Sequence, residues 1–238
     1  MKRSRIISII PLYIVIILCV ILFAAWGSSA VTVISENSPI NNRTCIVIDA
    51  GHGGVDGGAT SCTGVLESQI NLEIALKLND LFHLLGFDTV MIRKTDQSVH
   101  TQGNTIAAKK VSDLKERVRI INCTKNSVFI SIHQNYFSDE RYSGAQVFYM
   151  NSPQSKELAT TLQTNLNNSL CIGSKRQIKP ANGIYLMEHA KRTGILLECG
   201  FLSNRAEEAK LRNNEYQKNL SAIIAASVFN FLDHVNMN

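Results

Sequence analysis

The stretch IVIDAGHGG, residues 46–54, decides the fold of this chain. It begins with three branched apolar residues, continues with an acid, and ends with a histidine among glycines. A run that is apolar on both faces is typical of a strand in a sheet that helices cover on both sides. The glycines beside His52 allow a sharp turn and leave room around the imidazole. The stretch therefore predicts a buried strand that leads into a functional loop.

The rest of the chain continues the alternation of strands and helices that this first strand begins. Such an order predicts an α/β domain with an open sheet and helices on both faces. Binding and catalytic sites of such sheets lie at the carboxyl ends of the strands. Further strands are predicted at residues 87–93, 127–133, 144–150, 183–187 and 193–201, and helices at residues 69–86, 113–124, 152–170, 204–213 and 215–235.

Two segments between these elements carry local signals. Ser152 followed by Pro153 predicts a helix start, because the first helical position tolerates proline. Residues 97–112 are the one long polar stretch inside the domain, and they predict a mobile loop that either covers the site or is sensitive to proteolysis. Ser112 or Asp113 is then the expected cap of the next helix.

The first 30 residues have the features of a membrane-targeting segment. Lys2, Arg3 and Arg5 precede an uncharged apolar run over residues 6–26, and about 20 such residues span a bilayer as a helix. The small residues at 28–30 are also typical of a signal-peptide cleavage site. A cleaved signal peptide and an uncleaved anchor both remain open, and both predict that the chain is exported.

Polar residues with Pro, Asn and Ser at 31–43 predict a linker to a single folded domain at residues 44–236. The formal net charge is +5, and it falls to +2 without residues 1–30 (21 basic against 19 acidic residues). This near-balance argues against nucleic acid as a partner. Six cysteines at irregular spacing, without a C-x-x-C motif, predict mostly small buried side chains and at most one disulfide.

Four residues that could bind a metal or transfer protons lie at or near strand ends: His52, Glu67, His133 and Glu198. In a parallel sheet these side chains converge on one edge. Two imidazoles and a carboxylate form a three-ligand zinc set that leaves the fourth position open for water. Glu198 would then be a second carboxylate, free of metal, that moves protons. Asp49 is a candidate for orienting His52 or a neighbouring backbone group.

Each of these residues also has a purely structural interpretation. A lone histidine at a strand end is more often structural than a ligand, and Glu67 also suits the first turn of a helix. Glu198 could pair with a buried arginine. The glycine-rich loop matches neither common phosphate-binding pattern. Spacing alone therefore leaves the zinc site and a structural arrangement open.

Four motifs in order, VIDAGHGG, GVLES, SVFISIHQN and LLECGFLSN, make the chain resemble the zinc-dependent N-acetylmuramoyl-L-alanine amidases of bacteria. These enzymes cleave the amide between the lactyl group of the glycan and the stem peptide of peptidoglycan. The resemblance covers nearly the whole domain and implies a mixed, mostly parallel sheet flanked by helices. It also implies one Zn²⁺ bound by His52, Glu67 and His133, with Glu198 as the catalytic residue.

Further motifs, among them MIRKTDQ, SDLKERVRIIN and NGIYLMEHA, resemble the germination-specific amidases of spore-forming bacteria. That resemblance implies an N-terminal membrane signal and action on spore cortex peptidoglycan, with no separate wall-binding repeats. A partner deacetylase then allows muramic δ-lactam to form, which is the mark that cortex-lytic enzymes recognise. Ala50, Tyr136, Phe137 and Glu188 depart from the family pattern. The two aromatics either narrow the cleft or mark a surface for an accessory spore-envelope protein or lipoprotein.

Asn135, Arg93 and Asn182 are candidates for binding glycan or peptide, and structural polar contacts are an equally good interpretation of all three. Two other functions also remain open. One is a different zinc peptidase of the same architecture, such as a carboxypeptidase. The other is a membrane-anchored peptidoglycan-binding protein without catalysis. The complete set of proposed ligands and base favours the enzyme.

Overall fold

A computed structural model of the chain describes residues 44–237. The predicted signal or anchor at residues 1–30 and the predicted linker at residues 31–43 lie outside the described residues. Within residues 44–237, no helix combines the length and the apolar character needed to cross a bilayer.

The described residues fold around one six-stranded sheet with the order β2-β1-β3-β6-β4-β5. Strands β2, β1, β3 and β6 are mutually parallel, whereas β4 runs antiparallel to β6 and is parallel to β5. The expectation of a mixed, mostly parallel sheet is confirmed. The strands are β1 (Cys45–Ala50), β2 (Thr89–Met91), β3 (Ser127–Asn135), β4 (Gln146–Tyr149), β5 (Lys179–Pro180) and β6 (Thr193–Phe201).

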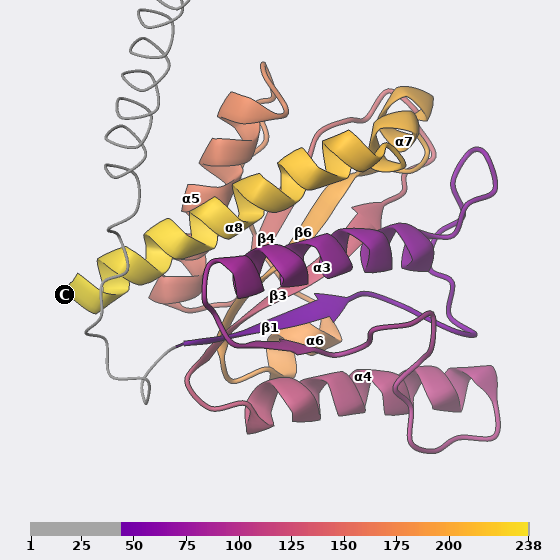
Figure 1. Cartoon of the computed structure of the whole chain (residues 1–238). Coiled ribbons are helices and arrows are strands. Elements are labelled where there is room, and N and C mark those ends of the chain that lie inside the picture. The colour runs from indigo at the N-terminus through magenta and orange to yellow at the C-terminus, as the bar shows by residue number, and fades with distance from the viewer. Residues whose placement is uncertain (1–43, 238) are drawn as a thin grey trace, which may run out of the picture. The chain divides into compact units, whose positions relative to one another are not determined.

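Helices cover both faces of this sheet, as the alternating order predicts (Figure 1). Helices α3 (Glu67–Leu84), α5 (Pro153–Ser169) and α8 (Asn214–Met237) pack on one face, and α4 (Ile106–Cys123) and α6 (Tyr185–His189) pack on the other. A short helix, α7 (Arg205–Leu211), follows β6. Helix α5 starts as predicted, because the Ser152 side chain accepts a hydrogen bond from the Ser155 backbone N–H.

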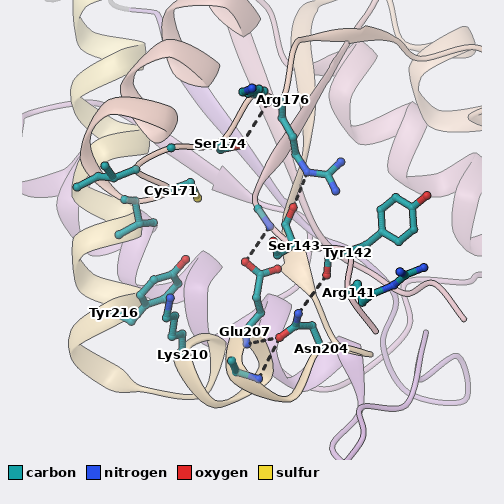
Figure 2. Close-up of a pocket in the computed structure, with 16 residues that line it drawn as sticks. Arg141, Tyr142, Ser143, Cys171, Ser174, Arg176, Asn204, Glu207, Lys210 and Tyr216 are labelled. Atoms are coloured by element: carbon teal, nitrogen blue, oxygen red, sulfur yellow. Dashed lines mark hydrogen bonds between the residues drawn. The ribbon is translucent and has the colours of Figure 1, made fainter. Parts of the chain in front are cut away.

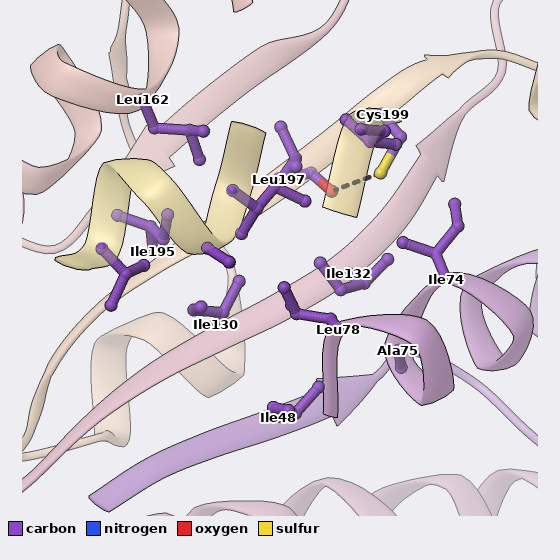
Figure 3. Packing of buried hydrophobic residues seen from close by; sticks show 14 of the residues in the cluster. Ile48, Ile74, Ala75, Leu78, Ile130, Ile132, Leu162, Ile195, Leu197 and Cys199 are labelled. Carbon is purple, nitrogen blue, oxygen red and sulfur yellow. Dashed lines mark hydrogen bonds between the residues drawn. The ribbon is translucent and has the colours of Figure 1, made fainter. Parts of the chain in front are cut away.

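The apolar run of β1 serves both layers, because successive side chains of a strand point to opposite faces. Ile46 and Ile48 belong to the core under α3, α5 and α8, whereas Val47 belongs to the core under α4 and α6. Figure 3 shows Ile48, Ile130 and Ile195, from three neighbouring strands, in the first of these cores. Full burial of each such side chain stabilises the fold by about 1.5–3 kcal/mol.

Strand register brings the polar strand ends together. Asp49 lies opposite Ser131 of β3, and His133 of β3 lies opposite Glu198 of β6. A register shift follows between His133 and Asn135, where the end of β3 departs from regular pairing. Bulges of this kind re-aim side chains at functional edges of sheets. The carboxyl ends of β1, β3 and β6 therefore form one polar edge.

Two predicted elements are wrong. Residues 183–187, predicted as a strand, instead lead into helix α6, and the Glu188 carboxylate accepts a hydrogen bond from the Gly183 backbone N–H at 2.6 Å. A five-residue apolar run fits a buried helical turn as well as a strand. The only strand between β4 and β6 is the two-residue β5, among the residues that the structure describes.

The predicted loop at residues 97–112 is also shorter than expected. Helix α4 already begins at Ile106, and its cap is Thr105, whose side chain accepts from the Ala108 backbone N–H. Asp113 lies inside the helix and accepts from the Ser98 hydroxyl at 2.7 Å, so this carboxylate ties the loop to the helix.

The described cysteines are all free thiols. Cys199 is buried in the core next to β3, as Figure 3 shows, so packing accounts for it. Cys62 and Cys123 are exposed, and the expectation of mostly buried cysteines fails for these two.

Candidate metal centre and catalytic carboxylate

His52, Glu67 and His133 come together at the polar edge of the sheet. His52 lies in the loop after β1, Glu67 is the first residue of α3, and His133 lies near the end of β3. Glu67 lies between the two imidazoles: its Oε2 is 3.3 Å from His52 Nε2 and its Oε1 is 3.0 Å from His133 Nδ1. One donor atom from each residue lies within 4.8 Å of the other two. The arrangement is compact enough for one ion to contact all three side chains.

Glycines make this convergence sterically possible. His52 itself has a left-handed backbone conformation with φ 61°. A Cβ atom on Gly51 would lie 2.2 Å from His133 Nε2, and one on Gly58 would lie 2.5 Å from Glu67 Oε2. The glycine-rich sequence is therefore required because the backbone passes directly against the proposed metal ligands.

Replacing Gly51 with alanine should therefore damage the site. The added methyl group must displace the His133 ring, since the two cannot occupy the same space. We expect zinc affinity to fall by about 10–100-fold, the range for changes that misplace ligands. Zinc titration calorimetry of the full-length protein measures the change. The control is Gly64→Ala, where the added Cβ meets nothing within 4 Å and only the positive φ of 89° opposes the change, so the backbone is strained without any contact to a ligand. An equal loss of zinc affinity in this control would contradict the steric explanation.

The His52 imidazole is oriented by Asp56, which the sequence analysis did not identify. His52 Nδ1 donates to Asp56 Oδ2 at 3.0 Å, which leaves Nε2 free to face the cluster. Asp49, the residue predicted to orient His52 or a neighbouring backbone group, does not contact the His52 ring. It is 1% exposed, accepts a hydrogen bond from the Ser131 hydroxyl at 2.6 Å, and pairs with Arg117.

Two buried arginines hold the backbone of the loop. Arg117, which is paired with Asp49, donates to the carbonyl oxygens of Ala50 at 2.9 Å and of His52 at 2.6 Å. Arg93 donates to the carbonyl oxygens of Ala50 and Gly51 at 2.8 and 3.0 Å. Together these cations neutralise the carbonyl dipoles that converge beneath the loop and fix the position of His52.

The three predicted substrate-binding residues occupy different environments. Arg93 is 4% exposed and its donors are engaged by backbone carbonyls, so its placement favours support of the loop over contact with a substrate. Asn135 lies two residues after His133 at the polar edge and is half-buried. Asn182 follows β5, which runs away from that edge, so the structure places Asn182 toward the opposite end of the sheet.

Glu67 accepts more hydrogen bonds than a carboxylate that only stabilises the first turn of its own helix would require. Its Oε1 accepts from Asn71 Nδ2 at 3.3 Å and from the Gln134 backbone N–H at 3.1 Å. Its Oε2 accepts from the Ala59 backbone N–H at 2.9 Å. Asn71 was predictable, because a side chain four residues after Glu67 lies on the same helix face. The other two donors come from loop and strand backbone.

The electrostatics of the cluster favour positive charge between the side chains. Burial alone would raise the pKa of Glu67, but the hydrogen bonds and charges of His133 and His52 lower it well below its usual range. Burial alone would lower the pKa of His52, but Glu67 and Asp56 raise it. An ionised carboxylate between two imidazoles is a donor set that fits a divalent cation such as Zn²⁺.

Glu198 lies beside this cluster without belonging to it. It pairs in register with His133, and its Oε2 is buried without a hydrogen-bond partner among the described residues. Burial raises the pKa of Glu198 to about 7; the positive field of His133 opposes this rise and the charge of Glu67 adds to it. The structural alternative, a pair with a buried arginine, is not found among residues 44–237, where no ion pair includes Glu198.

A mixed sheet with a His–Glu–His donor set and a separate carboxylate at one edge defines an α/β protein whose site has the groups that a hydrolase needs. The family is shown by comparison with known proteins. Residues 46–230 match the sequence pattern of the N-acetylmuramoyl-L-alanine amidases. The chain belongs to this family.

Individual relatives agree with this assignment. The chain is 34% identical over 192 residues to the germination-specific N-acetylmuramoyl-L-alanine amidase of Bacillus subtilis, a match that covers 78% of each protein. The CwlD amidase from Clostridioides difficile, solved in complex with the GerS lipoprotein, superposes with a TM-score of 0.77 at 35% identity, covering 80% of this chain and 99% of that chain. The catalytic domain of CwlV from Bacillus (Paenibacillus) polymyxa var. colistinus gives a TM-score of 0.69 at 28% identity, covering 80% and 98%.

Proposed function

We propose that this chain hydrolyses the amide between the lactyl group of N-acetylmuramic acid and the L-alanine of the stem peptide in peptidoglycan. The observation that carries the proposal is the buried, unpartnered Oε2 of Glu198 beside the His–Glu–His cluster. An orphaned carboxylate oxygen is costly in a folded protein. Its position beside a candidate metal centre suggests why the unpaired oxygen is retained: it could transfer protons in the reaction.

His52, Glu67 and His133 are the residues that would hold one Zn²⁺. Their donor atoms fit the ion by type and by mutual distance. Bound zinc would polarise the lactyl carbonyl and lower the pKa of water. Asp56 and the loop-supporting Arg117 keep His52 in place for this role.

Glu198 would transfer the protons. As a carboxylate, its Oε2 accepts the proton of the attacking water, and as an acid it then delivers that proton to the departing alanine nitrogen. A pKa of about 7, caused by burial, lets the group act in both directions near neutral pH. Asn135, at the same edge, is proposed to contact glycan or peptide.

The biological setting is proposed to be the spore cortex. Support comes from the likeness to a germination-specific amidase and to the CwlD amidase. Removal of stem peptides followed by action of a partner deacetylase would allow muramic δ-lactam to form. The segment at residues 1–30 would export the chain or anchor it in the membrane, with residues 31–43 as linker and residues 44–236 as the catalytic domain.

An accessory lipoprotein is proposed as a partner. The CwlD amidase, whose fold this chain shares, was solved in complex with the GerS lipoprotein. Tyr136 and Phe137 follow the end of β3 and are 54% and 49% exposed, which is unusual for two neighbouring aromatic residues. Exposed apolar clusters of this kind commonly mark interaction sites.

Peptide release from purified cortex peptidoglycan tests the proposed reaction. We expect new alanine amino groups to appear with zinc and to stay absent when a chelator has removed the metal, because the metal supplies most of the carbonyl activation. Mass spectrometry of the products separates the open alternatives. Intact stem peptides support the amidase, loss of a terminal residue indicates a carboxypeptidase, and binding without any cleavage indicates a non-catalytic wall-binding protein.

A further inference from the structure

A cavity near the carboxyl end of β6 is lined by none of the residues discussed above. Its volume is about 820 Å³, and its walls come from the segment before β4, the connection between α5 and β5, helix α7 and the start of α8. In Figure 2, Arg176, Arg141 and Tyr142 lie on one side of the cavity and Lys210 and Tyr216 lie on the other. We call this cavity the basic pocket.

The charge of the basic pocket is strongly one-sided. Four cations line it, Arg141, Lys175, Arg176 and Lys210, against one carboxylate, Glu207, although Arg141 is already paired with Asp139 at 2.7 Å. The chain beyond residue 30 has a net charge of only +2, so this concentration is local. Lys175 and Lys210 form no ion pair with any residue that the structure describes. Their charges are available to an anionic ligand.

The single carboxylate is already engaged. Glu207 Oε1 accepts from the Gly144 backbone N–H at 2.8 Å, and its Oε2 accepts from the Phe201 backbone N–H at 2.9 Å. Glu207 therefore fastens the wall of the pocket to the end of β6 and is not oriented toward the lysines as a counter-ion.

Arg176 is held rigidly at the wall. Its Nε donates to the Ser143 carbonyl at 2.7 Å, its Nη1 donates to Gln146 Oε1 at 3.2 Å, and its guanidinium lies 4.7 Å from the ring centre of Phe201. Gly144 has φ 89°, and a Cβ there would lie 3.4 Å from Arg176 Nε. A cation fixed in this way loses little freedom on binding a carboxylate, which is the condition for selective recognition.

The distance to the catalytic edge matches a short peptide. Phe201, whose ring lies under Arg176, is three residues after Glu198 along β6, which is at most about 10 Å at 3.3 Å per residue, because the pairing with β3 shifts register over this stretch. An extended peptide advances by about 3.3–3.6 Å per residue. A chain whose first amide is at Glu198 therefore reaches the pocket with its third or fourth residue.

We propose that the basic pocket binds the free carboxylates of the stem peptide, two or three residues beyond the amide that is cleaved. This inference rests on the proposed function, because it places the amide at Glu198. The volume exceeds that needed for a single small anion and lies in the range of pockets that enclose larger ligands. Tyr142 and Tyr216 supply contact area for the aliphatic parts of such a peptide. The pocket thus selects peptides that are long enough and carry negative charge.

Binding of the released peptide tests the subsite without requiring cleavage. The probe is a free stem tripeptide with its side-chain and terminal carboxylates intact, and the comparison is the same tripeptide with those carboxylates amidated. Calorimetry uses the full-length protein, the double variant Lys175→Glu/Lys210→Glu, and the control Lys125→Glu. Lys125 is an exposed lysine before β3, at the opposite end of that strand from His133.

We expect the charged tripeptide to bind the wild-type protein more tightly than the amidated one, and to lose roughly 5–20-fold in affinity in the double variant, as for two exposed ion pairs. Added salt should reduce the difference. With muramoyl tripeptide as substrate, the double variant should raise KM by a similar factor and leave kcat unchanged.

The proposed subsite would be wrong if the charged and amidated tripeptides bound equally well, or if Lys125→Glu lost as much affinity for the charged tripeptide as the double variant. If the wild-type protein cleaves the amide but does not bind the charged tripeptide in the pocket, the subsite is wrong and the proposed amidase function stands. If the tripeptide binds as expected and no amide is cleaved, the proposed function fails while the pocket remains a site for acidic peptides.

Discussion

The variant Glu198→Gln loses peptide release by about 10²–10⁴-fold in kcat, the usual contribution of a positioned general acid–base. Glutamine has nearly the same shape but can neither accept the proton of the water nor return it to the alanine nitrogen. Because Glu198 does not belong to the His–Glu–His cluster, zinc content and melting temperature should stay close to those of the wild-type protein. Release of alanine amino groups from cortex peptidoglycan, measured with zinc in excess, gives the comparison.

The matched control for this variant is Glu157→Gln, an exposed residue of α5. This variant also replaces a carboxylate with an amide, but on the exposed surface of α5. Its activity should therefore equal that of the wild type. If Glu198→Gln and the wild type release peptide at equal rates, Glu198 is not the base. If Glu198→Gln loses zinc as well as activity, the separation between the metal site and the base is wrong.

Replacing Arg117 with alanine should cause the largest loss of stability, roughly 3–5 kcal/mol, because it leaves a buried carboxylate without its counter-ion. Asp49, its partner, is 1% exposed, and the same arginine also holds the carbonyl oxygens of Ala50 and His52. In a domain of about 200 residues each kcal/mol lowers Tm by roughly 2–4 °C. Thermal unfolding of the full-length protein measures the effect.

Arg119→Ala is the control, because Arg119 lies two residues further along α4 and its contacts, an ion pair with Glu116 and a 3.9 Å contact with Cys123 Sγ, lie on the exposed face of the helix. Its Tm should stay at the wild-type value. The effect of Arg117 also has a defined pH dependence. Burial would raise the pKa of Asp49, but Arg117 and the Ser131 hydroxyl lower it below its usual value.

A depressed native pKa means that the stabilisation is fully present above the unfolded value of about 3.9 and is lost as the pH falls through the lower native value. In Arg117→Ala the arginine no longer opposes burial, which raises the pKa of Asp49, so the Tm difference between wild type and variant should be largest near neutral pH, shrink once the pH falls through that raised value, and shrink further in stronger acid. Equal Tm values at neutral pH would show that the buried pair does not support the loop.

Much of the fold was predictable because its strands carry unambiguous patterns. The apolar runs that became β1, β3 and β6 all contain or precede polar residues, and those of β1 and β3 are rich in β-branched residues, so their type and their shared edge follow from the sequence. The prediction of a strand at residues 183–187 was wrong because a five-residue apolar run does not distinguish a strand from a helical turn. The start of α4 was missed because Thr105, a good cap, lies in a polar stretch that hides the beginning of the helix.

The proposed metal ligands and the proposed base could be predicted from the sequence. The residues that hold them in place could not. His52, Glu67 and His133 lie at or near element boundaries, and Glu198 follows two buried leucines inside β6, so local patterns locate all four. Arg117 contacts the carbonyl of His52 from 65 residues away. Contacts of that kind depend on how α4 packs under the loop, and no local pattern encodes them.

The account depends most directly on one cation being held by His52, Glu67 and His133. Metal content measures this: full-length protein equilibrated with Zn²⁺, then freed of unbound metal, with and without the proposed lipoprotein partner. The account predicts one zinc ion per chain in the wild-type protein and in His83→Ala, an exposed histidine of α3 outside the cluster, and none in His133→Ala. Equal zinc in His133→Ala and His83→Ala, under both conditions, would contradict it.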